Sequence, residues 1–122
     1  MNLVNLTKAN FNELLSDSEI LLIDCWAPWC NACRDFQPVF EKVAAKFPDY
    51  TFAKLDTQDQ KEAAAKLGVE HIPTLILFRD EIMVFRQPGY LDENGLEGVV
   101  NQAMELDMDA VRTHIEEKEK SK

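Results

Sequence analysis

The sequence has few cysteines, little positive charge and no long apolar run. Its 3 cysteines, two of them spaced Cys-x-x-Cys, are too few for the disulfide framework of a small secreted domain. Its 13 basic residues are outnumbered by 22 acidic residues, and the net charge of −9 argues against general binding to nucleic acid or to anionic membranes. No segment approaches the roughly 18 apolar residues that a membrane-spanning helix requires.

The first residues contain neither a positively charged leader nor an apolar stretch of signal-peptide length. We therefore expect a cytoplasmic protein without a membrane partner. In a reducing compartment, a Cys-x-x-Cys pair is more often catalytic or metal-binding than structural. The 122 residues suit one domain, and the sequence contains no internal repeat, low-complexity tract or linker.

The most informative stretch is 26–33, which reads Trp-Ala-Pro-Trp-Cys-Asn-Ala-Cys. An apolar run, 20–23, precedes it, and a helical pattern over 35–47 follows it. The two cysteines therefore lie where a buried strand gives way to a helix, whose N-terminal N–H groups and dipole stabilise a thiolate. Cys33 falls on the same helical face as Cys30 and can attack a mixed disulfide formed there. The stretch predicts a dithiol–disulfide redox centre.

The remaining patterns predict an α/β fold with a central mixed β-sheet that is flanked by helices on both faces. Strands are expected over 3–6, 20–26, 50–55, 74–78 and 83–86. The first should lie at an edge of the sheet, and the continuously apolar second strand should lie at its centre. The last two are joined by a connection too short for a helix and should form an antiparallel pair.

Helix ends are indicated by capping residues. Thr7 is expected to cap the first helix, and Thr57 with Gln60 fits a capping box for a helix over 61–67. Asp92 is expected to cap a last helix, which buries Leu96, Val99, Val100, Ala103 and Met104.

The apolar face of the last helix continues through Met108, Val111 and Ile115, so this helix is expected to run on past Leu106. We divide the chain into a domain over 1–106 and a helical or frayed extension over 107–122. The extension reads as a solvated helix, with a helix that docks a partner or dimerises as the alternative.

Four features, in this order and spacing, resemble the thioredoxin family: Asp24-x-Trp26-Ala27, Trp29-Cys30-x-x-Cys33, Ile72-Pro73-Thr74 and Pro88-Gly89. A lone Cys-x-x-Cys would be a weaker signal, because zinc and iron–sulfur sites use the same spacing. The resemblance covers about residues 3 to 106. It implies the thioredoxin fold for this part of the chain, with the helical extension after it, and a protein-disulfide reductase that needs no bound cofactor or metal.

The chain departs from the family between the cysteines, where Asn31-Ala32 replaces the usual Gly-Pro. Proline has no N–H, so Ala32 supplies an additional backbone donor near the sulfur of Cys30, and the side chain of Asn31 can supply another. Donors that stabilise the thiolate favour the reduced form and make the pair more oxidising. We expect Asn31 and Ala32 to set a reduction potential above that of a typical thioredoxin.

The resemblance implies a role for each residue of the centre. Cys30 would be the attacking nucleophile and Cys33 the resolving thiol. Asp24, at an even offset from its buried neighbours on the strand, is expected to face inward with a raised pKa. By resemblance, Asp24 would be the general base for Cys33, acting through water, and Lys54 would lie near this acid.

Substrate binding is also implied by resemblance. Pro73 would be a cis-proline that presents the backbone of Ile72 to an extended substrate segment. Trp29 and Gly89 would complete an apolar surface around Cys30.

The implied partners are protein disulfides as substrates and an NADPH-linked flavin reductase that re-reduces the pair, and we expect a monomer. Asn31-Ala32 leaves open a more oxidising, isomerase-like or pathway-specific electron-transfer thioredoxin. An alternative of a different class is a metal or iron–sulfur module that uses Cys30 and Cys33 across a dimer, since Cys25 is the only other thiol.

Overall fold

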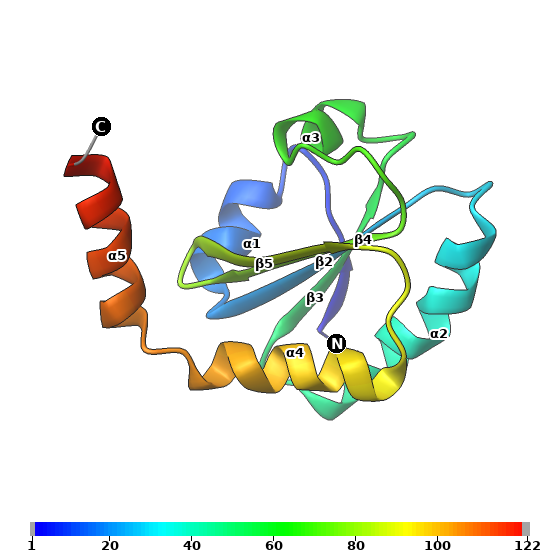
Figure 1. Cartoon of the computed structure of the whole chain (residues 1–122). Helices are drawn as coiled ribbons and strands as arrows, with labels where there is room; N and C mark the ends of the chain where they lie inside the picture. The colour runs from blue at the N-terminus through cyan, green and yellow to red at the C-terminus, as the bar shows by residue number, and fades with distance from the viewer. Residues whose placement is uncertain (1, 121–122) are drawn as a thin grey trace.

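The computed structural model describes residues 2–120, and Figure 1 shows the arrangement of the elements. The strands are β1 (Leu3–Asn5), β2 (Ile20–Trp26), β3 (Thr51–Asp56), β4 (Thr74–Arg79) and β5 (Ile82–Pro88). The helices are α1 (Phe11–Asp17), α2 (Asn31–Lys46), α3 (Lys61–Lys66), α4 (Glu93–Glu105) and α5 (Met108–Lys120).

The strands form one mixed sheet in the order β1-β3-β2-β4-β5. β1, β3 and β2 run parallel to one another, whereas β4 is antiparallel to both β2 and β5. The predictions of an edge position for β1, a central position for β2 and a terminal hairpin are therefore confirmed. The apolar run of β2 is completely buried, because helices cover both faces of the sheet at this central strand.

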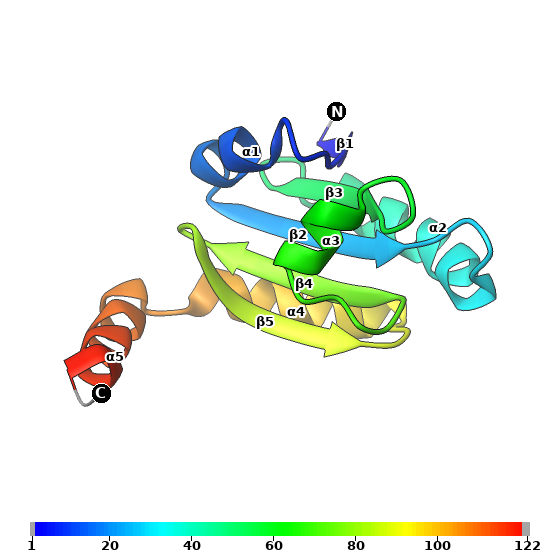
Figure 2. The same cartoon turned by 90° about the horizontal axis from the view of Figure 1, so that it is seen from above.

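Alternate residues of β2 pack against different layers of helices. Ile20 and Leu22 join the core formed with α2 and α4, whereas Leu21 and Ile23 join the core formed with α1 and α3. Figures 1 and 2 show these two pairs of helices on opposite faces of the sheet. The side chains of β2 thus contact the two helix layers alternately along the strand.

Two predicted helix caps are wrong, although α3 begins at Lys61 as predicted. α1 begins at Phe11 and is preceded by a turn, in which the hydroxyl of Thr7 accepts the N–H of Asn10 at 3.2 Å. The capping box predicted for α3 does not form, because the hydroxyl of Thr57 donates to the carbonyl of Trp26 at 3.0 Å. Both side chains satisfy nearby backbone groups outside the helices that they were expected to cap.

The prediction of one continuous C-terminal helix is also wrong. α4 ends at Glu105, and Leu106 is extended, with ψ of 135°. Arg79 of β4 donates to the carbonyls of Ala103, Met104 and Leu106, so the last turn of α4 is satisfied by a side chain from the sheet. Met104 is 42% exposed rather than buried as predicted.

A new helix then starts with its own cap. The carboxylate of Asp107 accepts the N–H groups of Asp109 and Ala110, at 3.1 and 3.2 Å. α5 stands beside the β4–β5 turn, at the opposite end of the molecule from the start of α2 (Figures 1 and 2). It is attached by the buried side chain of Met108 and by an ion pair of 3.0 Å between Arg112 and Asp80.

Candidate active site

Cys30 and Cys33 form a disulfide at the start of α2, with their Cα atoms 5.2 Å apart. Cys30 has extended backbone angles and occupies the N-cap position, and Cys33 lies in the first turn. The N–H of Cys33 donates to the sulfur of Cys30 at 3.2 Å. Cys30 is 8% exposed and Cys33 is 2% exposed, so Cys30 is the more exposed residue of the pair.

This position favours negative charge on the sulfur of Cys30. The first N–H groups of a helix lack partners within the helix, and one of them already points at this sulfur. Asn31 and Ala32 are exposed residues of the same first turn. The additional donors expected from Asn31 and Ala32 stay a prediction.

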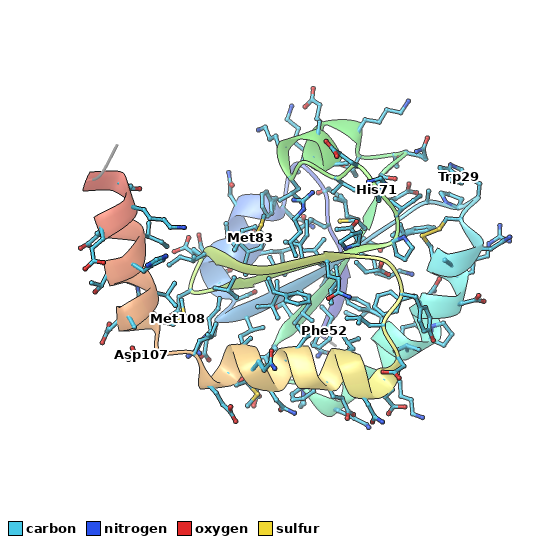
Figure 3. All side chains as sticks on the ribbon, viewed as in Figure 1. Trp29, Phe52, His71, Met83, Asp107 and Met108 are labelled. Carbon is cyan, nitrogen blue, oxygen red and sulfur yellow. A yellow bond between two sulfur atoms is a disulfide. The ribbon has the colours of Figure 1, made fainter. Side chains whose placement is uncertain are left out.

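Arg34 is part of the site that sequence reasoning missed. Its guanidinium donates to the carbonyl of Pro28 at 2.6 Å and so ties the loop before the disulfide to α2. That loop carries Trp29, which is 65% exposed and lies at the same end of the molecule as the disulfide (Figure 3). The only signal in the sequence was a cation directly after the second cysteine of the pair.

Asp24 lies two and four residues after Leu22 and Ile20 on β2, so its side chain points to the same face of the sheet, which α2 covers. It is 1% exposed, and neither carboxylate oxygen has a hydrogen-bond partner among the described residues. Burial raises the pKa of Asp24 to about 7, although the charge of Lys54 acts to lower it. A carboxyl group with this pKa can exchange a proton near neutral pH.

Lys54 lies directly opposite Asp24 in the register of the parallel strands β2 and β3. Its ammonium group lies over the ring of Trp26, 5.1 Å from the ring centroid. Lys54 and Trp26 line a hollow of about 350 Å³ that also includes Asp56. Lys54 therefore lies between the buried acid and the surface.

The loop before β4 packs against the disulfide. The peptide bond between Ile72 and Pro73 is cis, and Ile72 packs against the cluster formed by Ala27, Cys30 and Cys33. The N–H of Gly89 donates to the carbonyl of Pro73 at 2.7 Å. Gly89 has a φ of 99°, which favours glycine.

Trp29 and Ile72 also line one hollow of about 320 Å³ beside α3. The structure therefore brings the cysteines, Trp29, Ile72, Pro73 and Gly89 to one end of the sheet. Asp24 and Lys54 lie beneath them, on adjacent strands.

Cys25 faces the opposite layer and belongs to the core formed with α1 and α3. Burial raises the pKa of its thiol to about 12, so it is not a nucleophile near neutral pH. Within residues 2–120, no group of three or more histidine, cysteine or acidic side chains is arranged to hold a metal ion. The helices of this part of the chain are too short or too polar to span a membrane.

Comparison with known proteins gives a consistent result. The family model described as Thioredoxin matches residues 2–102. The chain is 47% identical over 116 residues to a Streptomyces coelicolor protein named "Putative thioredoxin 2", which covers 95% of this chain and 87% of that relative. It is 38% identical over 95 residues to a thioredoxin of Alicyclobacillus acidocaldarius, covering 77% of this chain and 90% of the relative.

A solved structure agrees with these relatives. A point-mutant thioredoxin from Halobacterium salinarum superimposes with a TM-score of 0.80 at 30% identity, covering 86% of this chain and 93% of the other. The metal-module alternative is not favoured, since the Cys30–Cys33 pair forms a disulfide in a thioredoxin fold. The chain belongs to the thioredoxin family and is a protein-disulfide oxidoreductase with a Cys30–Cys33 redox centre.

Proposed function

We propose that this protein reduces disulfides of other proteins by a two-step exchange at Cys30 and Cys33. The thiolate of Cys30 attacks one sulfur of the substrate disulfide, and the other substrate sulfur leaves as a thiolate and takes up a proton. The thiolate of Cys33 then attacks the sulfur of Cys30 and releases the second substrate thiol. Two electrons pass to the substrate, and the Cys30–Cys33 disulfide remains. The position of this pair at the start of α2, beside the Ile72–Pro73 loop, carries the proposal.

Asp24 is proposed as the group that accepts the proton of Cys33 before the second step. Its pKa of about 7 supports this role, because a base of that pKa can take a proton near neutral pH and return it later. The carboxylate faces the layer of α2, the helix that carries Cys33. Lys54 would limit the rise of this pKa by its opposing charge.

The substrate would bind as an extended segment along the backbone of Ile72. A cis-proline loop beside the disulfide is supported as the contact, because Ile72 packs against the cluster formed by Ala27 and the two cysteines. Trp29 would supply exposed apolar surface on one side. On the other side, Gly89 has no side chain to obstruct the approach of a partner.

The oxidised protein would be re-reduced by an NADPH-linked flavin reductase, as the family implies. We further propose that the protein is a cytoplasmic monomer in which residues 1–106 contain the whole redox domain. Residues 107–122 would be an extension without a role in the exchange. The distance between α5 and the start of α2 supports this division (Figure 1).

An insulin-reduction assay, in which dithiothreitol re-reduces the Cys30–Cys33 pair, tests the proposal directly. Wild-type protein should raise the rate at which reduced insulin chains form an insoluble aggregate, and a Cys30→Ser variant should not. Failure of the wild type to accelerate this reaction would overturn the proposed function.

The reduction potential tests the proposed role of the dipeptide. After equilibration in dithiol–disulfide buffers, the pair should have a potential above the roughly −270 mV of thioredoxin. The double variant Asn31→Gly, Ala32→Pro should shift it downward, and Asn31→Gly alone separates the side-chain donor from the backbone donor. A wild-type value at or below roughly −270 mV would contradict the tuning by Asn31 and Ala32, whereas a value near the roughly −180 mV of protein disulfide isomerase would contradict a general reductant.

A further inference from the structure

Arg86 makes contacts that none of the proposed roles uses. It lies on β5 opposite Ile76, a residue of the core formed with α1 and α3. Its guanidinium reaches the end of α3, where Nη1 donates to the carbonyl of Leu67 and Nη2 donates to the carbonyl of Gly68. One planar side chain therefore holds two consecutive backbone carbonyls.

These carbonyls need an external partner. α3 has only six residues, and helices of this length are not stable by themselves. The chain turns away at Gly68, which has a φ of 68°, so no further helical turn follows. The guanidinium of Arg86 covers this glycine, at 3.6 Å from the position that a Cβ would take. Arg86 thus fixes the end of α3 to the edge of the sheet.

The segment 68–73 that follows leads directly to the redox centre. Its far end is also held from the β5 side, because Gly89, which directly follows β5, donates its N–H to the carbonyl of Pro73 at 2.7 Å. Between these two attachments lies Ile72, which packs against the cluster that contains Cys30 and Cys33. The placement of Ile72 therefore depends on the attachment at each end of the segment.

We propose that Arg86 is a positioning residue for protein substrates, because it fixes the start of the segment that presents the backbone of Ile72 beside Cys30. This inference rests on the proposed binding of substrate along Ile72. The donors of Arg86 that are described go to Leu67 and Gly68 rather than to a sulfur. Its loss should therefore weaken the binding of an extended protein segment without changing the exchange chemistry.

The test compares a protein disulfide with a small one. Arg86→Met keeps the length and the apolar stem but removes both donors, and Arg86→Lys keeps the charge but not the planar pair of donors. With insulin as the substrate, and with dithiothreitol to re-reduce the Cys30–Cys33 pair, Arg86→Met should raise KM about 5- to 10-fold and leave kcat unchanged. Arg86→Lys should have a smaller effect on KM. The rate with dithiobis-nitrobenzoate, which is too small to occupy the loop, and the reduction potential should stay at the wild-type values.

Arg112→Met is the matched control, because it removes an arginine that pairs with Asp80 at the far end of the molecule. It should leave KM for insulin unchanged. The inference is overturned if KM for insulin is unchanged in both Arg86 variants, or if the rates with insulin and with dithiobis-nitrobenzoate fall together. If Arg86→Met does not fold, Arg86→Lys alone decides between these outcomes. A wild-type protein inactive on insulin would instead refute the proposed function.

Discussion

Asp24 and Lys54 stand opposite each other on the adjacent parallel strands β2 and β3. Asp24 is buried without a hydrogen-bond partner among the described residues, while Lys54 is half-buried over the ring of Trp26. The lysine charge favours the ionised acid, and burial opposes it more strongly, which leaves the pKa of Asp24 at about 7. The protein therefore retains, on the strand that leads to its redox centre, an acid that is about half ionised near neutral pH.

This pKa predicts a pH-dependent cost in stability. An acid whose pKa is raised from 3.8 to about 7 binds its proton more tightly in the folded chain than in the unfolded chain. Its contribution to stability is complete below about pH 4 and is lost as the pH rises toward 7. Asp24→Asn should therefore raise the free energy of unfolding at pH 8 by up to about 4 kcal/mol, and by much less at pH 4.

Urea unfolding of the oxidised protein at both pH values measures this effect. Asp49→Asn, which changes an exposed carboxylate, is the matched control and should give a small difference at both. Equal effects of Asp24→Asn at the two pH values would contradict the raised pKa.

Replacing the resolving thiol should trap the intermediate. In Cys33→Ser, Cys30 still attacks a protein disulfide, but no second thiol releases the product. Mass spectrometry under non-reducing conditions should then show a covalent complex with one equivalent of substrate, which dithiothreitol removes. In the control Cys30→Ser, Cys33 is only 2% exposed and should form little of this complex. Accumulation of more complex in Cys30→Ser would reverse the two assigned roles.

A glycine in the β4–β5 turn should increase the stability of the protein. Asp80 and Glu81 connect the strands with φ of 50° and 68°, a conformation that costs a residue with a side chain roughly 1 kcal/mol. Glu81→Gly should therefore stabilise the protein by about 0.5 to 1 kcal/mol in thermal or urea unfolding.

Glu81→Ala serves as the control for this turn. It removes the same long contact of 3.5 Å with Ser16 but keeps the left-handed backbone strain. It should give no increase in stability. A gain as large as that of Glu81→Gly would show that the side chain, and not the backbone, was unfavourable.

Removal of the extension should lower the stability of the protein without changing its activity. A chain that ends after Asp107 should reduce insulin at the wild-type rate, because α5 lies at the opposite end from Trp29 and the disulfide (Figure 3). Its free energy of unfolding should fall by about 2 kcal/mol, since the buried side chain of Met108 is lost.

Two point variants check the source of this loss. Met108→Ala should reproduce most of it, whereas Arg112→Ala, which breaks an exposed ion pair, should cost less than about 1 kcal/mol. A truncated protein with altered kinetics would contradict the assignment of the exchange to residues 1–106.

The sheet and the position of the cysteines could be predicted because their signals are local. The continuous apolar run of β2 indicates a central strand, and Cys30 directly precedes the helical pattern of α2. The burial of Asp24 also followed from its parity on that strand. The cis peptide at Pro73 came from the family resemblance alone, since no local pattern distinguishes it from a trans peptide.

Several of the features that were missed depend on contacts between distant parts of the chain. The apolar periodicity of α4 continues into α5, but Arg79 satisfies carbonyls at the end of α4 from 24 to 27 residues earlier in the sequence. Arg86 likewise donates to backbone carbonyls that lie far from it in the sequence, and Arg34 donates to a carbonyl six residues before it. Charge patterning identifies ion pairs and cannot identify such bonds.

We expect the hydrogen bonds from Arg79 to the end of α4 to separate two cooperative units of different stability. Because the last carbonyls of α4 are already satisfied from the sheet, α5 can detach and melt without loosening the turn before it. Amide hydrogens of α5 should therefore exchange with solvent through a sub-global opening of low free energy, while those of β2 and β4 wait for complete unfolding. We therefore expect the boundary between a slowly exchanging domain and a rapidly exchanging terminal segment to lie at the turn that Arg79 holds.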